Sequence, residues 1–188
     1  MNKVKNLLTY RYAEIIHDLT AEFVDQYILG KYSRLKARPD YRSGDQMIQA
    51  GRSGKQNIVE AVGQRLVSSK GEIKLLGVAN ASFEELLSDF EDFLRQNGMT
   101  IYDKNDQRIT DFRNLAYRLS NLKNLSASGQ LLERPKLFGE PEKDANFLLS
   151  LCHIETYLLY KQIKAAEDKF VNSGGYSENL FKKRLEKR

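Results

Sequence analysis

Apolar residues recur every three or four positions through most of the chain, which is the spacing of helices with one buried face. One stripe runs between about Thr9 and Leu29 and contains Tyr12, Ile16, Leu19, Phe23 and Tyr27. A second follows Ser43 and contains Met47, Gly51, Gly54, Ile58 and Ala61. A third stops at Asn97 and contains Ile73, Leu76, Phe83, Leu86, Phe90 and Phe93. The pattern predicts three long helices in residues 1–98.

Two polar pairs mark where the second and third helices are expected to begin. Ser43 with Gln46, and Ser69 with Glu72, have the spacing of a capping box. In that motif each side chain bonds to the backbone N–H of the other residue, so unpaired donors of the first turn are satisfied. The two helices are therefore expected to start at Ser43 and Ser69.

The second helix carries very small residues in its interior, at Gly51, Gly54 and Ala61. Glycine inside a helix costs about 1 kcal/mol relative to alanine, and the usual reason to keep it is the close approach of another backbone. Asn57 and Glu60 are polar residues on the same helix. They either line a polar pocket or, as we favour, fix helix register by hydrogen bonding across the bundle. We therefore predict a closely packed helical hairpin.

The second half of the chain predicts one more long helix and two shorter ones. Residues 99–140 break the periodic pattern and are expected to form an insertion with a short helix from Asp111 to Leu122. The long helix occupies 141–172 and opens on a proline, which suits a first helical turn. Residues 173–188 form a basic extension with a short helix. The expected fold is all-α, an up-and-down four-helix bundle with the short helical insertion before its last long helix.

The charge of the chain is concentrated in a few segments. The formal net charge is +5, and the last ten residues contribute five cations against one glutamate. Residues 31–42 hold five cations against one aspartate, whereas 84–92 hold five acids and no base. The chain is dipolar and not uniformly basic.

The two basic segments are the best candidates for nucleic-acid contact. Cations neutralise phosphates and release counterions, while tyrosines can stack on unpaired bases. The candidates in the first segment are Tyr32, Arg34, Lys36, Arg38, Tyr41 and Arg42, and those in the C-terminal segment are Lys182, Lys183, Arg184, Lys187 and Arg188. The alternative is that both segments serve solubility or subunit contacts.

The sequence lacks complete catalytic, metal-binding and nucleotide-binding motifs. Glu14 and His17 have the E-x-x-H spacing of di-iron bundles, but the second such pair that these sites need is absent. Cys152 and His153 are neighbours in a predicted helix and point in different directions, so Cys152 is interpreted as a buried apolar residue. No P-loop, G-x-G-x-x-G or G-x-S-x-G occurs. We expect no enzyme activity, cofactor, metal or small-molecule substrate.

Composition adds an expectation about location. No run of 18 apolar residues and no signal-peptide pattern is present, so neither a membrane span nor secretion is expected. A single cysteine suits a reducing compartment. The expected location is the cytoplasm.

The second and third helices resemble a known family. The matching residues are Gln46, Ala50, Ser53, the stretch Asn57-Ile58-Val59-Glu60-Ala61, and the stretch Ala81-Ser82-Phe83-Glu84-Glu85-Leu86. Their pattern is similar to that of the four-helix bundle proteins encoded in ribosomal RNA intervening sequences, a family that includes accessory proteins of diversity-generating retroelements. The family has glycine where this chain has Ala61 and Ala81. Residues 99–140 and the C-terminal end look like the extended subgroup with a suffix domain.

That resemblance carries expectations of its own. It implies a four-helix bundle that assembles into a ring-shaped pentamer and has no catalytic residues. The retroelement relatives bind nucleic acid and a reverse transcriptase through a positively charged surface. The leading hypothesis is therefore a non-enzymatic, homo-oligomeric helical scaffold that associates weakly with nucleic acid. The alternative is an interaction module that binds only protein.

Overall fold

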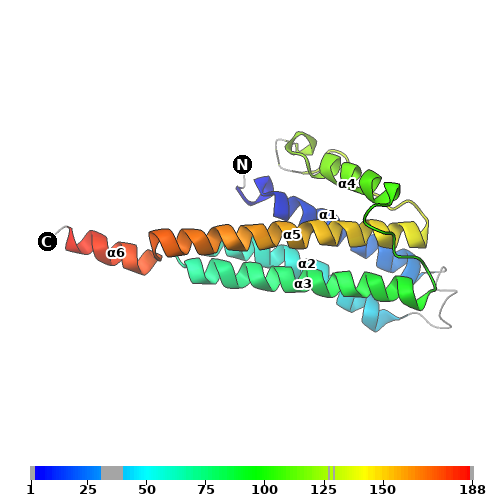
Figure 1. The fold of residues 1–188 in the computed structure, drawn as a ribbon, viewed down its shortest axis with the longest axis horizontal. Coiled ribbons are helices and arrows are strands. Elements are labelled where there is room, and N and C mark those ends of the chain that lie inside the picture. Colours follow the sequence, from blue (N-terminus) through cyan, green and yellow to red (C-terminus); the bar gives the residue numbers. More distant parts are fainter. Residues whose placement is uncertain (1–2, 31–39, 127, 129, 187–188) are drawn as a thin grey trace.

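The computed structural model describes residues 3–30, 40–126, 128 and 130–186, and this part of the chain is helical with no strand. The all-α prediction is confirmed. The helices are α1 (Leu8–Phe23), α2 (Tyr41–Gln64), α3 (Ser69–Gln96), α4 (Gln107–Ser120), α5 (Pro141–Ser173) and α6 (Tyr176–Leu185) (Figure 1). Short helical turns lie at Lys3–Asn6, Val24–Ile28 and Leu122–Asn124.

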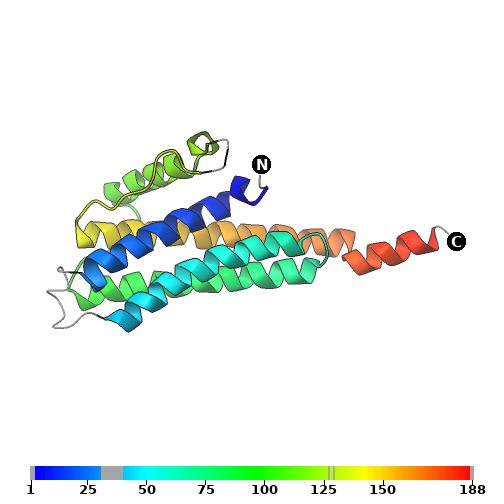
Figure 2. The ribbon, with the colours of Figure 1, turned by 180° about the vertical axis from the view of Figure 1, so that it is seen from behind.

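Four helices enclose the core. α1 packs on α2, α2 on α3, α3 on α5, and α5 on α1, so the contacts form a closed cycle (Figures 1 and 2). The largest fully buried side chains include Phe23, Phe83, Phe90 and Phe147, which come from α1, α3 and α5. α4 lies outside this group against α1 and α5, and α6 extends beyond the end of α5. No helix in the described residues is long and apolar enough to cross a bilayer.

α2 begins earlier than predicted and α3 begins at the predicted Ser69, but in both helices another side chain makes the cap. Asp40 accepts hydrogen bonds from the Ser43 backbone N–H at 3.1 Å and from the Ser43 hydroxyl at 2.9 Å, so α2 begins at Tyr41. Ser68 accepts from the Gly71 N–H at 3.0 Å, and α3 begins one residue later. Both predicted capping boxes are wrong. The short helix α4 also begins earlier than predicted, because Asp106 caps it.

The small residues of α2 lie where other helices come close. A Cβ placed on Gly51 would lie 3.4 Å from the Cα of His17, so Gly51 allows the backbone of α1 to approach. A Cβ on Gly54 would lie 2.5 Å from Cε2 of Phe83, so Gly54 makes room for an aromatic ring of α3. The predicted close approach of another backbone therefore occurs at Gly51, whereas Gly54 faces a side chain. Ala61 is fully buried.

The polar pair of α2 does not act across the bundle. The Asn57 amide donates to the Ser53 carbonyl oxygen at 2.9 Å within its own helix, and Glu60 is exposed. The proposed cross-helix role of this pair is wrong, because four-residue spacing lets the amide bond locally. The hydroxyl of Ser82 on α3 makes the cross-helix contact instead, and donates to Ser53 Oγ at 3.1 Å.

Long-range hydrogen bonds tie the first long helix to the last. The Tyr27 hydroxyl donates to Asp144 Oδ2 at 2.6 Å, and the Thr9 hydroxyl donates to Gln162 Oε1 at 2.9 Å. Asp144 is fully buried and also accepts from the backbone N–H groups of residues 138–140. Near Thr9 at the start of α1, the buried Arg11 donates to the Ser120 carbonyl oxygen at 2.5 Å, which fixes the end of α4.

Candidate nucleic-acid interface

The predicted basic residues fall at two separate places. Tyr32, Arg34, Lys36 and Arg38 lie outside the described residues, as do Lys187 and Arg188. Of the rest, Tyr41 and Arg42 are exposed in the first turn of α2, and Lys182, Lys183 and Arg184 are exposed on α6. The start of α2 and the whole of α6 lie at opposite ends of the long axis (Figures 1 and 2). The fold therefore does not join the described members of the two clusters into one surface.

A third set of cations and aromatic rings lies on the outer face of α5. Tyr157 and Tyr160 have exposed fractions of 59% and 53%. The ammonium of Lys161 lies 5.5 Å from the centroid of the Tyr157 ring, and that of Lys164 lies 5.9 Å from the Tyr160 ring. We call these four residues the Tyr–Lys strip. It combines rings that can stack on bases with cations that can neutralise phosphates.

The Tyr–Lys strip is absent from the sequence-based predictions, although the spacing of its residues could have indicated it. Tyr157 and Lys161, like Tyr160 and Lys164, are four residues apart and therefore neighbours on a helix surface. Lys164 also forms an ion pair with Glu167 at 2.9 Å, and the hydrogen bond from the ammonium raises the pKa of Lys164. The carboxylate reduces the net positive charge at that end of the strip.

The Tyr–Lys strip borders a groove of about 670 Å³ between α3, α4 and α5. Buried side chains of α4 and α5 form its floor, including Ile109 and Leu149. The remaining lining comes from Glu91, Ile101, Tyr102, Asp103, Lys104, Arg113, Asn146, Ser150, His153, Ile154 and Tyr157. The floor is therefore mainly apolar, and the rim carries charges of both signs.

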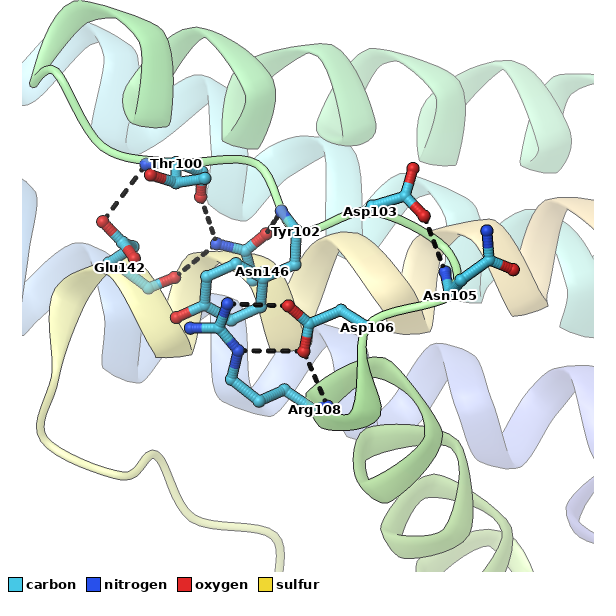
Figure 3. A network of polar contacts seen from close by, with 8 residues as sticks. All are labelled: Thr100, Tyr102, Asp103, Asn105, Asp106, Arg108, Glu142 and Asn146. Carbon is cyan, nitrogen blue, oxygen red and sulfur yellow. Dashed lines mark hydrogen bonds and ion pairs between the residues drawn. The ribbon is translucent and has the colours of Figure 1, made fainter.

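A polar network holds the rim of this groove in place (Figure 3). Asn146 of α5 accepts from the Tyr102 backbone N–H at 2.8 Å and donates to the Thr100 carbonyl oxygen at 2.9 Å. Glu142 accepts from the Thr100 N–H at 3.1 Å. Because Asn146 is buried, these bonds fasten the connection between α3 and α4 onto α5. They set the position of the neighbouring Ile101, Asp103 and Lys104.

Arg108 is engaged in the same network. Its guanidinium donates to both carboxylate oxygens of Asp106, at 3.0 and 2.7 Å, and its central carbon lies 3.4 Å from the centroid of the Tyr102 ring. The hydrogen bonds from Arg108 lower the pKa of Asp106 to about 2. Arg108 therefore serves to anchor the start of α4 and is already paired (Figure 3).

The candidate metal pair and the candidate thiol of the sequence lie on different helices, α1 and α5. Within the described residues no three His, Cys, Asp or Glu side chains are placed to hold a metal ion. Nδ1 of His17 lies 3.3 Å from Asp18 Oδ1 and from the Lys55 ammonium, while Glu14 accepts from the Tyr10 hydroxyl at 3.4 Å. Cys152 is fully buried, and this burial raises the pKa of its thiol. A thiol of that kind is inert.

A small cavity of about 120 Å³ lies where the ends of α1 and α3 meet the start of α2. Asp89 lines this cavity, and its Oδ2 is buried with no hydrogen-bond partner. Burial, and then the charges of Glu85 and Asp92, raise the pKa of Asp89 to about 6. Asp40 and Tyr27 also line the cavity.

We expect the Asp89→Asn variant to be more stable than the wild type at pH 7. The folded pKa of Asp89 lies above the ordinary value of 3.8, so its contribution to stability is lost as pH rises from about 4 to about 6. Since the carboxyl is only half-buried, the gain should be on the order of 1 kcal/mol. Urea denaturation at pH 4 and pH 7 measures it. An equal effect of the substitution at both pH values would contradict the assignment.

Comparison with known proteins adds no relative. No protein-family model, no curated protein and no solved structure matches this chain.

Proposed function

We propose that this protein is a non-enzymatic, homo-oligomeric helical scaffold that binds nucleic acid weakly through dispersed basic surfaces. The closed cycle of contacts among α1, α2, α3 and α5 supports an up-and-down four-helix bundle as its framework. The sequence resemblance supports a pentamer, and the single buried cysteine suits the cytoplasm. Repetition of a weak patch around an oligomer would strengthen binding through multivalency.

The Tyr–Lys strip is the observation that carries the nucleic-acid proposal. Exposed tyrosines interleaved with lysines on one helix face match the chemistry of single-stranded binding, in which bases stack on rings and cations follow the backbone. Tyr41 with Arg42, and the cations of α6, supply further phosphate contacts. Since no base-reading element is evident, binding should show little sequence preference.

A protein-only interaction module is the second candidate. It is favoured by α6, which exposes Leu180, Phe181 and Leu185 and buries no residue. Apolar side chains of this kind suit a protein partner better than a polyphosphate backbone.

We expect the wild type to bind single-stranded RNA at low salt and to lose affinity steeply as salt increases. Tyr157→Ala with Tyr160→Ala should weaken binding about 30-fold or more, because each of the two base–ring stacks contributes about 1–3 kcal/mol. Lys161→Glu with Lys164→Glu should weaken it further and reduce the salt dependence. Fluorescence anisotropy with a labelled oligonucleotide measures both effects.

The matched control is Lys74→Glu with Lys123→Glu, which makes the same change in net charge at exposed lysines outside the strip. If this control weakens binding as much as the Lys161 and Lys164 pair does, net charge alone explains the binding. If the wild type fails to bind at low salt, the nucleic-acid proposal is wrong and the protein-only module is the better account.

A further inference from the structure

The helix α6 has the features of an element that lacks its partner. It is 10 residues long, none of its residues is buried, and it continues past the end of α5 (Figure 1). Phe181 has an exposed fraction of 62%, and Leu180 and Leu185 are exposed beside it. Isolated helices shorter than about 12–15 residues are marginally stable in water. A surface that covers its apolar side chains would stabilise it.

The cations of α6 lie next to these apolar side chains. Arg184 is four residues after Leu180 and three after Phe181, so it lies within the same strip of the helix surface. Lys183 is three residues after Leu180 and borders the strip. The surface that α6 presents is therefore an apolar strip with positive charge, and its complement is an apolar floor with an acidic rim.

The groove between α3, α4 and α5 has such a floor, and acidic residues form part of its rim. Ile101, Ile109, Leu149 and Ile154 supply apolar lining, and Ile101 has an exposed fraction of 47%. Its α3 side carries Glu91, which belongs to the acidic run 84–92. Asp103 is a second acid of the rim, whereas Lys104 and Arg113 are its cations, so we expect a docked cationic helix to turn its charges towards Glu91.

The groove and α6 lie far apart on the same chain. The α5 residues that line the groove lie between 146 and 157, whereas α6 begins at Tyr176 and runs away from them beyond the end of α5 (Figure 1). At a rise of about 1.5 Å per residue, the 16 helical positions from 157 to the end of α5 at Ser173 alone correspond to roughly 24 Å. A chain cannot place its own α6 in its own groove with this arrangement.

We propose that α6 of one copy docks in the α3–α4–α5 groove of a second copy. Leu180, Phe181 and Leu185 cover the apolar floor, and Arg184 with Lys183 faces the α3 side and its Glu91. The network around Asn146 holds the 101–104 rim against which α6 packs (Figure 3). This contact deepens the proposed function, because it supplies a means by which the oligomeric scaffold assembles.

Such a contact is head-to-tail, since the two copies contribute different surfaces. A pair joined in this way leaves one α6 and one groove free for further copies, so the contact generates a closed ring or an open chain. Two variants can therefore disrupt the α6 side and the groove side of the contact independently. Leu180→Asp with Phe181→Asp removes the α6 half, and Ile101→Arg removes the groove half by replacing an apolar contact with a like charge.

Mixing the two variants tests the proposal. We expect the wild type to associate, and each variant alone to have a dissociation constant for self-association at least about 10-fold higher. The mixture should form a heterodimer that grows no further, because it retains one intact α6 and one intact groove. Light scattering measures the masses, and circular dichroism verifies that each variant is folded. Leu66→Asp is the matched control, because Leu66 is 78% exposed and lies outside α6 and the groove.

Several results would contradict docking of α6 in the groove of a second copy. A monomeric wild type, variants that associate like the wild type, or a mixture that stays monomeric would overturn the α6–groove contact. Association lost equally in Leu66→Asp would attribute it to general apolar exposure and would also overturn the contact. RNA binding is scored separately with the variants of the Tyr–Lys strip, so failure of the docking proposal and failure of nucleic-acid binding are distinguishable.

Discussion

Adding a single methyl group at Gly54 is expected to lower the free energy of unfolding by about 1–3 kcal/mol. The new Cβ of Gly54→Ala would lie 2.5 and 2.6 Å from Cε2 and Cζ of Phe83. Phe83 is fully buried between helices, so its ring cannot move aside without disturbing the packing of the core. Urea denaturation at constant pH measures the loss.

Gly77→Ala is the matched control for this prediction. Gly77 also lies within a long helix, but it is exposed, and nothing lies within 4 Å of the Cβ position. Alanine should therefore stabilise α3 by up to about 1 kcal/mol through helix propensity alone. A gain in stability at Gly54 similar to the gain at Gly77 would show that the Phe83 contact does not limit the size of the side chain.

Glu155 is expected to make the protein less stable as pH rises. It is fully buried on α5, both of its carboxyl oxygens lack a hydrogen-bond partner, and burial raises its pKa well above 4.5. The folded state therefore binds the proton more tightly than the unfolded chain does. Its contribution to stability is complete below about pH 4.5 and declines as pH rises towards the folded pKa.

Two substitutions separate charge from polarity at this position. Glu155→Gln cannot ionise, so the decline of stability above pH 4.5 should become shallower. Glu155→Met has a similar length and no polar terminus, and should add on the order of 2 kcal/mol at pH 7. Among the groups influenced by Glu155, Tyr12 and Cys152 both have raised pKa values and titrate at higher pH. Since Asp89 titrates near pH 6, the comparison is made in the Asp89→Asn background. An unchanged pH profile would show that Glu155 is not neutral in the fold.

The helices were predictable because the residues on the buried face of a helix recur every three or four positions in the sequence. Phe83, Leu86, Phe90 and Phe93 were assigned to one face from their spacing, and all four are buried. Helix starts were less predictable, because a cap depends on which side chain reaches the first N–H groups. Near the start of α2 the sequence offers both Asp40 and Ser43, and the geometry selects Asp40.

The candidate surfaces were harder to find from sequence, because the same residue type can lie on either side of a helix. Tyr12 and Tyr27 are buried in the stripe that their spacing predicts, whereas Tyr157 and Tyr160 are exposed on α5. Glu155 presents the opposite problem, because it is an ionisable residue that lies on the buried side of its helix. Glu155 follows the apolar Ile154 on α5, and the structure buries the glutamate more deeply than the isoleucine.

The buried bond between Tyr27 and Asp144 has a consequence for the order in which the protein is made. Its two ends are 117 residues apart, so α1 leaves the ribosome long before its partner on α5 is synthesised. α2 and α3 need only the short turn between them, and this hairpin can form from contiguous chain. α1 can pack on α2 before α5 emerges, but the part of its apolar face that α5 covers stays exposed until then. Before α5 is synthesised, the nascent chain is therefore most prone to aggregation and most dependent on chaperones.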